Sequence, residues 1–168
     1  MKIKLFFILF LFLIYRPLIP GGDCPISGNL LFEAKKIAFY IEVKDKDFSE
    51  DLLKECLYYE KVDHADIVLL QSHLETGNYT SEVFLLSSNL FGMKYPIFRE
   101  TTAVGILLHH AYYNHWTDSV KDYKLWQDWY KSVGYNMDEY LVFLKFIRYA
   151  KDPRYIHKLI YLAQKDIT

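Results

Sequence analysis

The sequence predicts a mainly helical α+β fold, with one domain over residues 47–168 behind an N-terminal segment. Apolar side chains recur at helical spacing in several stretches, whereas the stretch from Lys94 to Tyr113 has no helical period and carries β-branched residues. The chain has 168 residues, of which 52% are hydrophobic and 18% aromatic, so it can fill a sizeable core. We therefore expect helices beside a small β lobe of two short strands joined by a turn.

Residues 1–22 have the pattern of an export leader. Lys2 and Lys4 precede a continuous apolar run from Leu5 to Ile14. This run is shorter than the ~20 residues that a membrane span needs, and the basic start is typical of a secretory signal. No clean cleavage site precedes Gly21, so the leader is either a signal peptide or an uncleaved anchor. Any membrane attachment is expected through this leader alone.

The two cysteines leave two alternatives open. In an exported protein Cys24 and Cys56 could form one disulfide. Alternatively, Cys56 is a small buried residue on a helix and Cys24 lies in a tail. No Cys and His set has the spacing of a metal site, and the adjacent His109 and His110 would point to different sides of a helix. We expect no metal and no cofactor.

The first part of the domain is expected to begin with a helix after an irregular segment. Residues 23–46 form an N-terminal segment, in which Asn29–Val43 is expected to be extended or irregular because β-branched and aromatic residues are mixed there. Asp47 and Glu50 have capping-box spacing and would start a first helix that runs to about Tyr59.

A second helix carries a single carboxylate to its end. Ile67, Leu70 and Leu74 fall at i, i+3 and i+7, and Gly77 is a natural stop. Glu75 would therefore lie in the last turn, where the negative end of the helix dipole favours the protonated form. A carboxyl group with a raised pKa can deliver a proton near neutral pH, as a general acid must. The sequence thus makes this glutamate a candidate catalytic acid.

Three further helices are expected after the β lobe. Thr117 would cap a helix that runs to about Val133, with Trp126 and Trp129 along one side and Tyr130 along the other. The next helix starts near Asn136. The last runs over about 154–165, with these residues on its buried side: Ile156, Leu159, Ile160 and Ala163.

Several motifs occur in one order along the chain: Leu74–Gly77, Asn89–Lys94, His110–Tyr113, Trp116–Tyr123 and Tyr149–Tyr155. This ordered set resembles bacterial glucosaminidases of the mannosyl-glycoprotein endo-β-N-acetylglucosaminidase type, glycoside hydrolase family seventy-three. One motif alone is weakly specific, but chance rarely reproduces the set.

The resemblance implies a lysozyme-like domain whose β lobe flanks a substrate groove. It implies a peptidoglycan hydrolase that cleaves the β-1,4 bond after N-acetylglucosamine, with Glu75 as general acid. Such a protein would be exported to the periplasm or outside the cell, in association with the cell wall. Peptidoglycan glycan strands would be its partner, and we expect a monomer. A net charge of −1 argues against binding to nucleic acid.

The second catalytic group stays open at the level of sequence. Glycosidases usually use two carboxylates, and Glu100, Asp118 and Asp122 are the available candidates. If the N-acetyl group of the substrate attacks instead, a tyrosine could help to steady it. Tyr113 and Tyr123 are then candidates, and the resemblance favours Tyr123.

The groove itself is expected to bind sugar through polar and aromatic side chains. Gln71, one turn before the catalytic glutamate, is placed to hydrogen-bond the acid or a ligand, and Asn89 to contact an acetamido or hydroxyl group. Phe91, Tyr113 and Trp116 would form the walls, because aromatic faces stack on sugar rings.

The sequence leaves two alternatives to this function open. The first is a muramidase or lytic transglycosylase with the same fold and acid, which cleaves on the other side of the disaccharide. The second is a glycan-binding or assembly protein without catalysis, which the missing second acid would favour.

Overall fold

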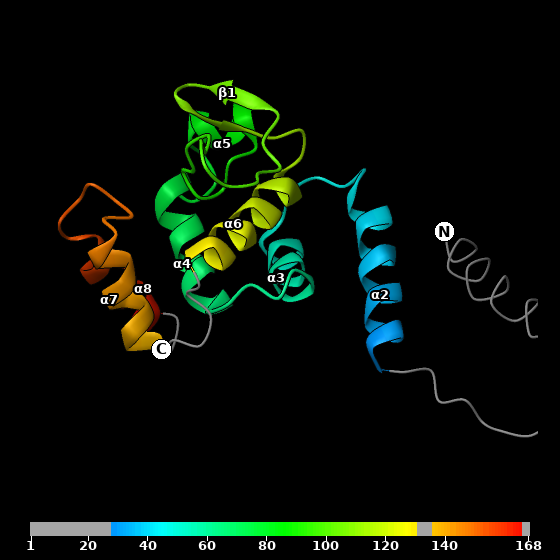
Figure 1. Ribbon diagram of the computed structural model, residues 1–168, viewed down its shortest axis with the longest axis horizontal. Coiled ribbons are helices and arrows are strands. Elements are labelled where there is room, and N and C mark those ends of the chain that lie inside the picture. Colours follow the sequence, from blue (N-terminus) through cyan, green and yellow to red (C-terminus); the bar gives the residue numbers. More distant parts are fainter. Residues whose placement is uncertain (1–27, 131–135, 166–168) are drawn as a thin grey trace, which may run out of the picture. The chain divides into compact units, whose positions relative to one another are not determined.

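The computed structural model describes residues 28–130 and 136–165, and it divides into two compact units between Asp47 and Phe48. Figure 1 labels the elements of both units in chain order. The expected leader, residues 1–22, lies outside the described residues, and so does Cys24. Cys56 is buried on a helix, and both alternatives for the pair, a disulfide or a Cys56 that is only a small buried residue, stay open.

The first unit contains helix α2, Gly28–Val43. The expectation of an extended or irregular segment here was wrong. Alanine, lysine and glutamate residues, which are strong helix formers, separate the β-branched and aromatic positions, and the buried Phe39 and Val43 lie four residues apart on one face.

The second unit opens with α3, Glu50–Tyr59. Its N-cap is Ser49, whose hydroxyl accepts a hydrogen bond from the backbone N–H of Leu52 at 3.3 Å. The helix therefore starts later than predicted, because a serine at this place satisfies an N–H that the more distant Asp47 does not reach. The buried side of the helix is Leu53, Cys56 and Leu57.

Helix α4, Ala65–Thr76, agrees with the prediction, and Gly77 follows it in the left-handed conformation. Helix α6, Trp116–Tyr130, lies beside it in the same unit (Figure 1). The expected N-cap Thr117 is instead in the first turn of α6, where its hydroxyl hydrogen-bonds the ring of His115 at 2.9 Å.

The β lobe consists of the hairpin β1, Gly105–Leu107, and β2, His110–Tyr112, beside the short helix α5, Glu82–Ser87 (Figure 1). The strands are antiparallel, with Ile106 opposite Ala111. The two turn residues between them both have positive φ, which matches the right-handed twist of a two-residue hairpin. The predicted pair of short strands is confirmed.

Helices α7, Met137–Phe146, and α8, Tyr155–Lys165, complete the unit. Asn136 and Glu139 form a capping box at the start of α7. Leu159 on α8 is buried as predicted, but Ile160 is 41% exposed, since α8 presents only a narrow face to the core. No helix within the described part of the chain is long and apolar enough to cross a membrane.

Candidate active site

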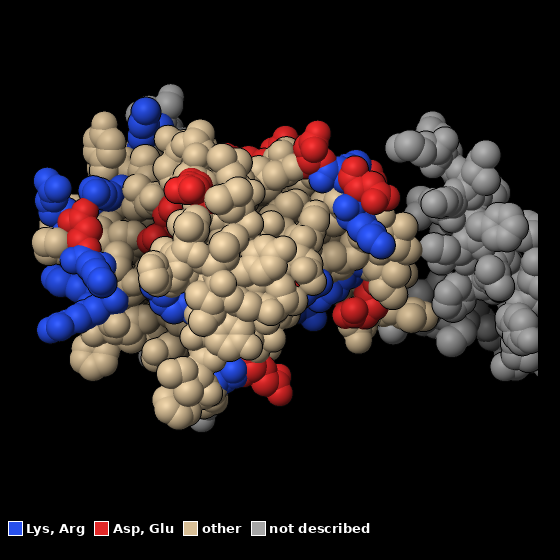
Figure 2. Space-filling view, turned by 90° about the horizontal axis from the view of Figure 1, so that it is seen from above, with Lys and Arg blue, Asp and Glu red and all other residues tan. Residues whose placement is uncertain are grey.

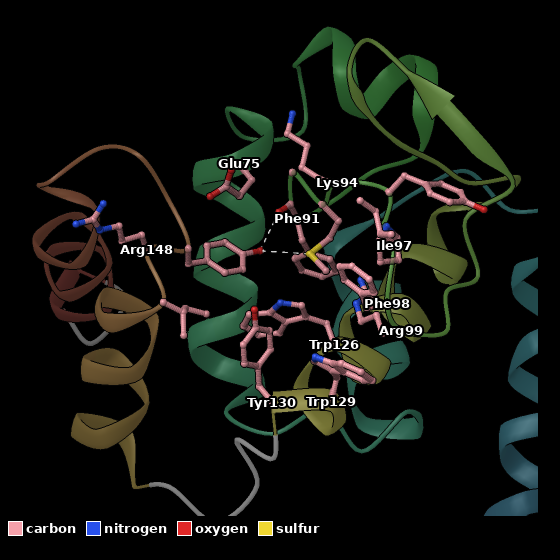
Figure 3. A pocket seen from close by; sticks show the side chains of 16 residues that line it. Glu75, Phe91, Lys94, Ile97, Phe98, Arg99, Trp126, Trp129, Tyr130 and Arg148 are labelled. Atoms are coloured by element: carbon pink, nitrogen blue, oxygen red, sulfur yellow. Dashed lines mark hydrogen bonds between the residues drawn. The ribbon is translucent and has the colours of Figure 1, made fainter.

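A pocket of about 370 Å³ opens at the end of α4, and we call it the Glu75 pocket. One wall is the segment 91–99, a second is the segment 147–149, and aromatic side chains of α6 form the floor. Figure 3 shows the Glu75 carboxyl on α4 above Trp126 and Tyr130. Residues from three other parts of the second unit thus line the pocket at this one carboxyl group.

The Glu75 carboxyl is largely removed from solvent. Burial raises its pKa above the ordinary value for a glutamate, and an interaction with the hydroxyl of Tyr155 opposes this shift. Among the described residues, Glu75 is the only acidic residue that lines the pocket. The geometry therefore supplies a carboxyl group that holds its proton to higher pH than a surface glutamate does.

The backbone of the facing loop comes unusually close to this carboxyl. Gly92 has φ +62°, and a Cβ atom at this position would lie 2.7 Å from Oε2 of Glu75. No residue with a side chain fits there without displacing the carboxyl, and the left-handed backbone adds a second requirement for glycine. The loop is therefore shaped to lie against the glutamate.

A comparison with known proteins identifies the family of the second unit. The family model described as mannosyl-glycoprotein endo-β-N-acetylglucosaminidase matches residues 51–167. The chain belongs to this glucosaminidase family. The family identifies the domain as a mainly helical, lysozyme-like α+β fold and supports glycoside hydrolysis of a peptidoglycan-type glycan. No curated protein and no solved structure matched the chain.

In this glucosaminidase, the expected glycan contact Asn89 is buried and holds the loop instead. Its amide nitrogen donates to the carbonyl oxygens of Met93 at 3.0 Å and Ala111 at 2.8 Å. Its amide oxygen accepts from the N–H groups of Phe91 at 3.3 Å and Met93 at 3.0 Å. Both donors and both lone pairs are used, so the side chain has no capacity left for a sugar.

Tyr123 and Gln71 lie in a buried hydrogen-bond network. The Tyr123 hydroxyl donates to Oε1 of Gln71 at 2.7 Å and lies 2.7 Å from the hydroxyl of Tyr140. Nε2 of Gln71 in turn donates to the hydroxyl of Tyr155 at 3.2 Å. Tyr123 and Gln71 are both 0% exposed and line no part of the pocket. Gln71 hydrogen-bonds Tyr155, whose hydroxyl lowers the pKa of Glu75, and Tyr123 hydrogen-bonds Gln71 one step further away.

Asp122 and Tyr113 form a second buried group. The guanidinium of Arg99 donates to both carboxylate oxygens of Asp122, at 2.7 and 3.0 Å, and the hydroxyl of Tyr113 donates to the same carboxylate at 2.7 Å. Burial, with the adjacent Asp122 charge, raises the pKa of Tyr113 far above its ordinary value. The group joins the segment 91–99 to α6, and neither Asp122 nor Tyr113 lines the Glu75 pocket.

The remaining predicted residues divide in the same way. Phe91 lines the pocket, as expected. Trp116 is buried and packs edge-on against Phe48, and Glu100 is exposed outside the pocket lining. The structure thus brings Glu75 and Phe91 together at the pocket and places the other candidates in the supporting core or on the surface.

Sequence reasoning missed much of the pocket floor and one wall. Trp126, Trp129 and Tyr130 all line the pocket, although Tyr130 was assigned to the other side of its helix. Their spacing of i, i+3 and i+4 was the available signal. Arg148 and Tyr149 also line the pocket, and the hydroxyl of Tyr149 donates to the carbonyl of Phe91 at 2.8 Å. Tyr149 begins the last of the family-like motifs, but nothing in that motif indicated a place in the pocket wall.

Proposed function

We propose that this glucosaminidase hydrolyses the β-1,4 bond after N-acetylglucosamine in peptidoglycan, with Glu75 as the general acid. The observation that supports this most directly is the burial of Glu75 in a pocket where no other described acidic residue is present. The leader pattern of residues 1–22 adds the proposal that the protein acts outside the cytoplasmic membrane, at the cell wall.

The acid step follows from the environment of the carboxyl group. Because burial keeps Glu75 protonated to higher pH, it can donate its proton to the glycosidic oxygen as the bond to the anomeric carbon breaks. The departing sugar then leaves as a neutral alcohol. The Glu75 carboxylate that remains can then accept a proton from the water molecule that completes the hydrolysis.

The nucleophile of this bond-breaking step is best supplied by the N-acetyl group of the substrate. Asp122 is occupied by Arg99 and Tyr113, and Glu100 lies outside the pocket lining, so neither offers a nucleophile there. The acetamido oxygen can attack the anomeric carbon while Glu75 protonates the leaving oxygen, and water then opens the resulting ring. This route requires one carboxyl group and no second one.

The floor of the pocket supports a sugar-binding role. Trp129 is 55% exposed and Tyr130 is 45% exposed, and both line the pocket. Figure 3 shows both side chains on α6 at the lower edge of the pocket. Exposed aromatic faces of this kind stack on the apolar C–H surface of a sugar ring.

Digestion of purified peptidoglycan tests the proposal. The described domain and its Glu75→Gln variant are incubated with the polymer, the new reducing ends are reduced, and the products are identified by mass. Fragments that end in reduced glucosamine, and that are absent with the variant, are the expected result. Ends of reduced muramic acid would indicate a muramidase, and anhydro ends a lytic transglycosylase. Binding without products from the parent protein would indicate a non-catalytic glycan-binding protein.

A further inference from the structure

We propose that a basic hollow beside the Glu75 pocket binds free carboxylates on the peptide branches of the glycan substrate. The hollow has a volume of about 430 Å³ and is formed by the end of α7, the turn after it and the start of α8. Its cationic residues are Lys145, Arg148 and Lys151. The inference rests on the proposed function, because it names a feature of the same polymer.

The charge of this hollow is not compensated by the protein. Lys145, Arg148 and Lys151 are exposed, and none of them forms an ion pair with any residue that the structure describes. Asp152 is the acidic residue in the lining, and Nζ of Lys158 already lies 2.7 Å from its carboxylate. Figure 2 shows Lys and Arg side chains gathered around one acidic group at the end of the second unit where α7 and α8 lie.

Arg148 connects this hollow to the catalytic pocket. It lines both of them, and Figure 3 shows its guanidinium directed away from the carboxyl of Glu75. The backbone of Arg148 is left-handed, with φ +54°, at the point where the chain leaves α7. The residue therefore stands in the wall between the two cavities and presents its charge on the outer side.

A peptide-bearing glycan matches this arrangement. A strand that lies in the Glu75 pocket carries acidic peptides on alternate sugars, so a branch leaves the pocket beside the bond that is cleaved. Arginine and lysine donate charge-assisted hydrogen bonds to carboxylates. The other walls of the hollow include Leu144, Pro153 and Ile156, which suit the short apolar side chains of a peptide. Continuity with the pocket favours a branch of the same polymer over a separate anion.

The test compares peptide-bearing glycan with glycan from which the peptides have been removed by an amidase. Binding is measured with Glu75→Gln, so that the result does not depend on turnover, and with Glu75→Gln/Lys145→Gln/Lys151→Gln. Lys54→Gln/Lys61→Gln in the same background is the control, since both lysines are exposed and line neither cavity. Urea unfolding of each variant checks that the fold is intact.

We expect the Lys145/Lys151 variant to bind peptide-bearing glycan about threefold to tenfold more weakly than its parent, with a smaller difference at high salt. On peptide-free glycan the two should bind equally, and the Lys54/Lys61 control should match the parent on both. In the active protein the same pair of substitutions should raise KM on peptide-bearing glycan and leave kcat unchanged.

Equal loss on both glycans, or no loss on either, would overturn the inference. A loss of binding that requires a phosphate polymer attached to the wall would also overturn it. The binding assay is therefore repeated on glycan before and after chemical removal of that polymer. The fate of the proposed function is separate. If binding depends on the peptides and the two lysines but the active protein forms no products, hydrolysis is refuted and this inference stands. If the active protein forms products but binding does not depend on the two lysines, hydrolysis stands and this inference is refuted.

Discussion

A Cβ atom on Gly92 would lie 2.7 Å from Oε2 of Glu75, so the loop backbone lies close against the carboxyl group in the last turn of α4. The two residues belong to separate sequence motifs, and their contact defines one edge of the pocket. The exact position of the carboxyl group therefore depends on the absence of a side chain in the loop.

Gly92→Ala should strongly reduce activity. The added methyl group must push the Glu75 carboxyl aside, and we expect kcat/KM to fall by about tenfold or more, with about 1–2 kcal/mol lost from the free energy of unfolding. Gly77→Ala is the matched control, because Gly77 also has a positive φ but its Cβ would meet nothing closer than 3.8 Å. It should lose similar stability and keep most activity. Equal activity losses in the two variants would show that strain alone is responsible.

Glu75→Gln should abolish turnover without harming the fold. Loss of a general acid typically lowers kcat by about a hundredfold to ten-thousandfold.

The same variant tests the protonation of Glu75 through stability. Burial raises the pKa of Glu75, so its ionised form is disfavoured in the folded state. The stability that protonated Glu75 provides is fully present below the ordinary carboxyl pKa and is lost as the pH rises through the raised pKa. In urea unfolding, the free energy of unfolding of Glu75→Gln should equal that of the parent at acidic pH and exceed it at pH 7. A lower midpoint at pH 7 would contradict this assignment.

Tyr155→Phe should shift the pH dependence of activity. The Tyr155 hydroxyl lowers the pKa of Glu75, so its removal should raise that pKa further. Activity that needs protonated Glu75 falls as the pH rises through this pKa, and the basic limb of kcat/KM should move to higher pH. Tyr140→Phe is the control, since Tyr140 contacts Tyr123 and Gln127 within the same network. An unshifted profile in Tyr155→Phe would show that its hydroxyl does not act on the acid.

Asp122 should prove to be structural. Asp122→Leu leaves the buried guanidinium of Arg99 without its carboxylate, and we expect a loss of about 3–5 kcal/mol in the free energy of unfolding. The double variant Arg99→Met/Asp122→Leu should recover much of this loss, as seen in urea unfolding. Asp122→Asn, assayed at a temperature where it is folded, should retain kcat within about threefold. A stable Asp122→Asn protein without turnover would return Asp122 to the catalytic groups.

Trp129 should contribute to glycan affinity rather than to stability. Because its ring is 55% exposed and lines the pocket, Trp129→Ala should raise KM by about threefold to tenfold with little change in unfolding. Phe146→Ala is the control, because Phe146 is 85% exposed and lies outside the pocket lining. An equal KM in Trp129→Ala and the parent would remove Trp129 from the sugar-binding surface.

Local patterns were sufficient for the helix that carries the acid. Apolar spacing predicted α4, and Gly77 marked its end, because both signals act over a few neighbouring residues. The hairpin was predicted for the same reason. The failure at α2 is also local: the β-branched residues were given too much weight against the helix formers between them.

The sequence by itself determined the order of most elements, the place of Glu75 at a helix end and the family motifs. Only the tertiary structure decided which candidates reach the pocket. Tyr123, Asn89 and Asp122 are polar residues within those motifs, yet packing between α4, α6 and the loop buries them and uses their hydrogen bonds internally. Burial and polar pairing arise from segments far apart in the chain, so a residue's type and spacing cannot tell a groove contact from a residue that supports the groove.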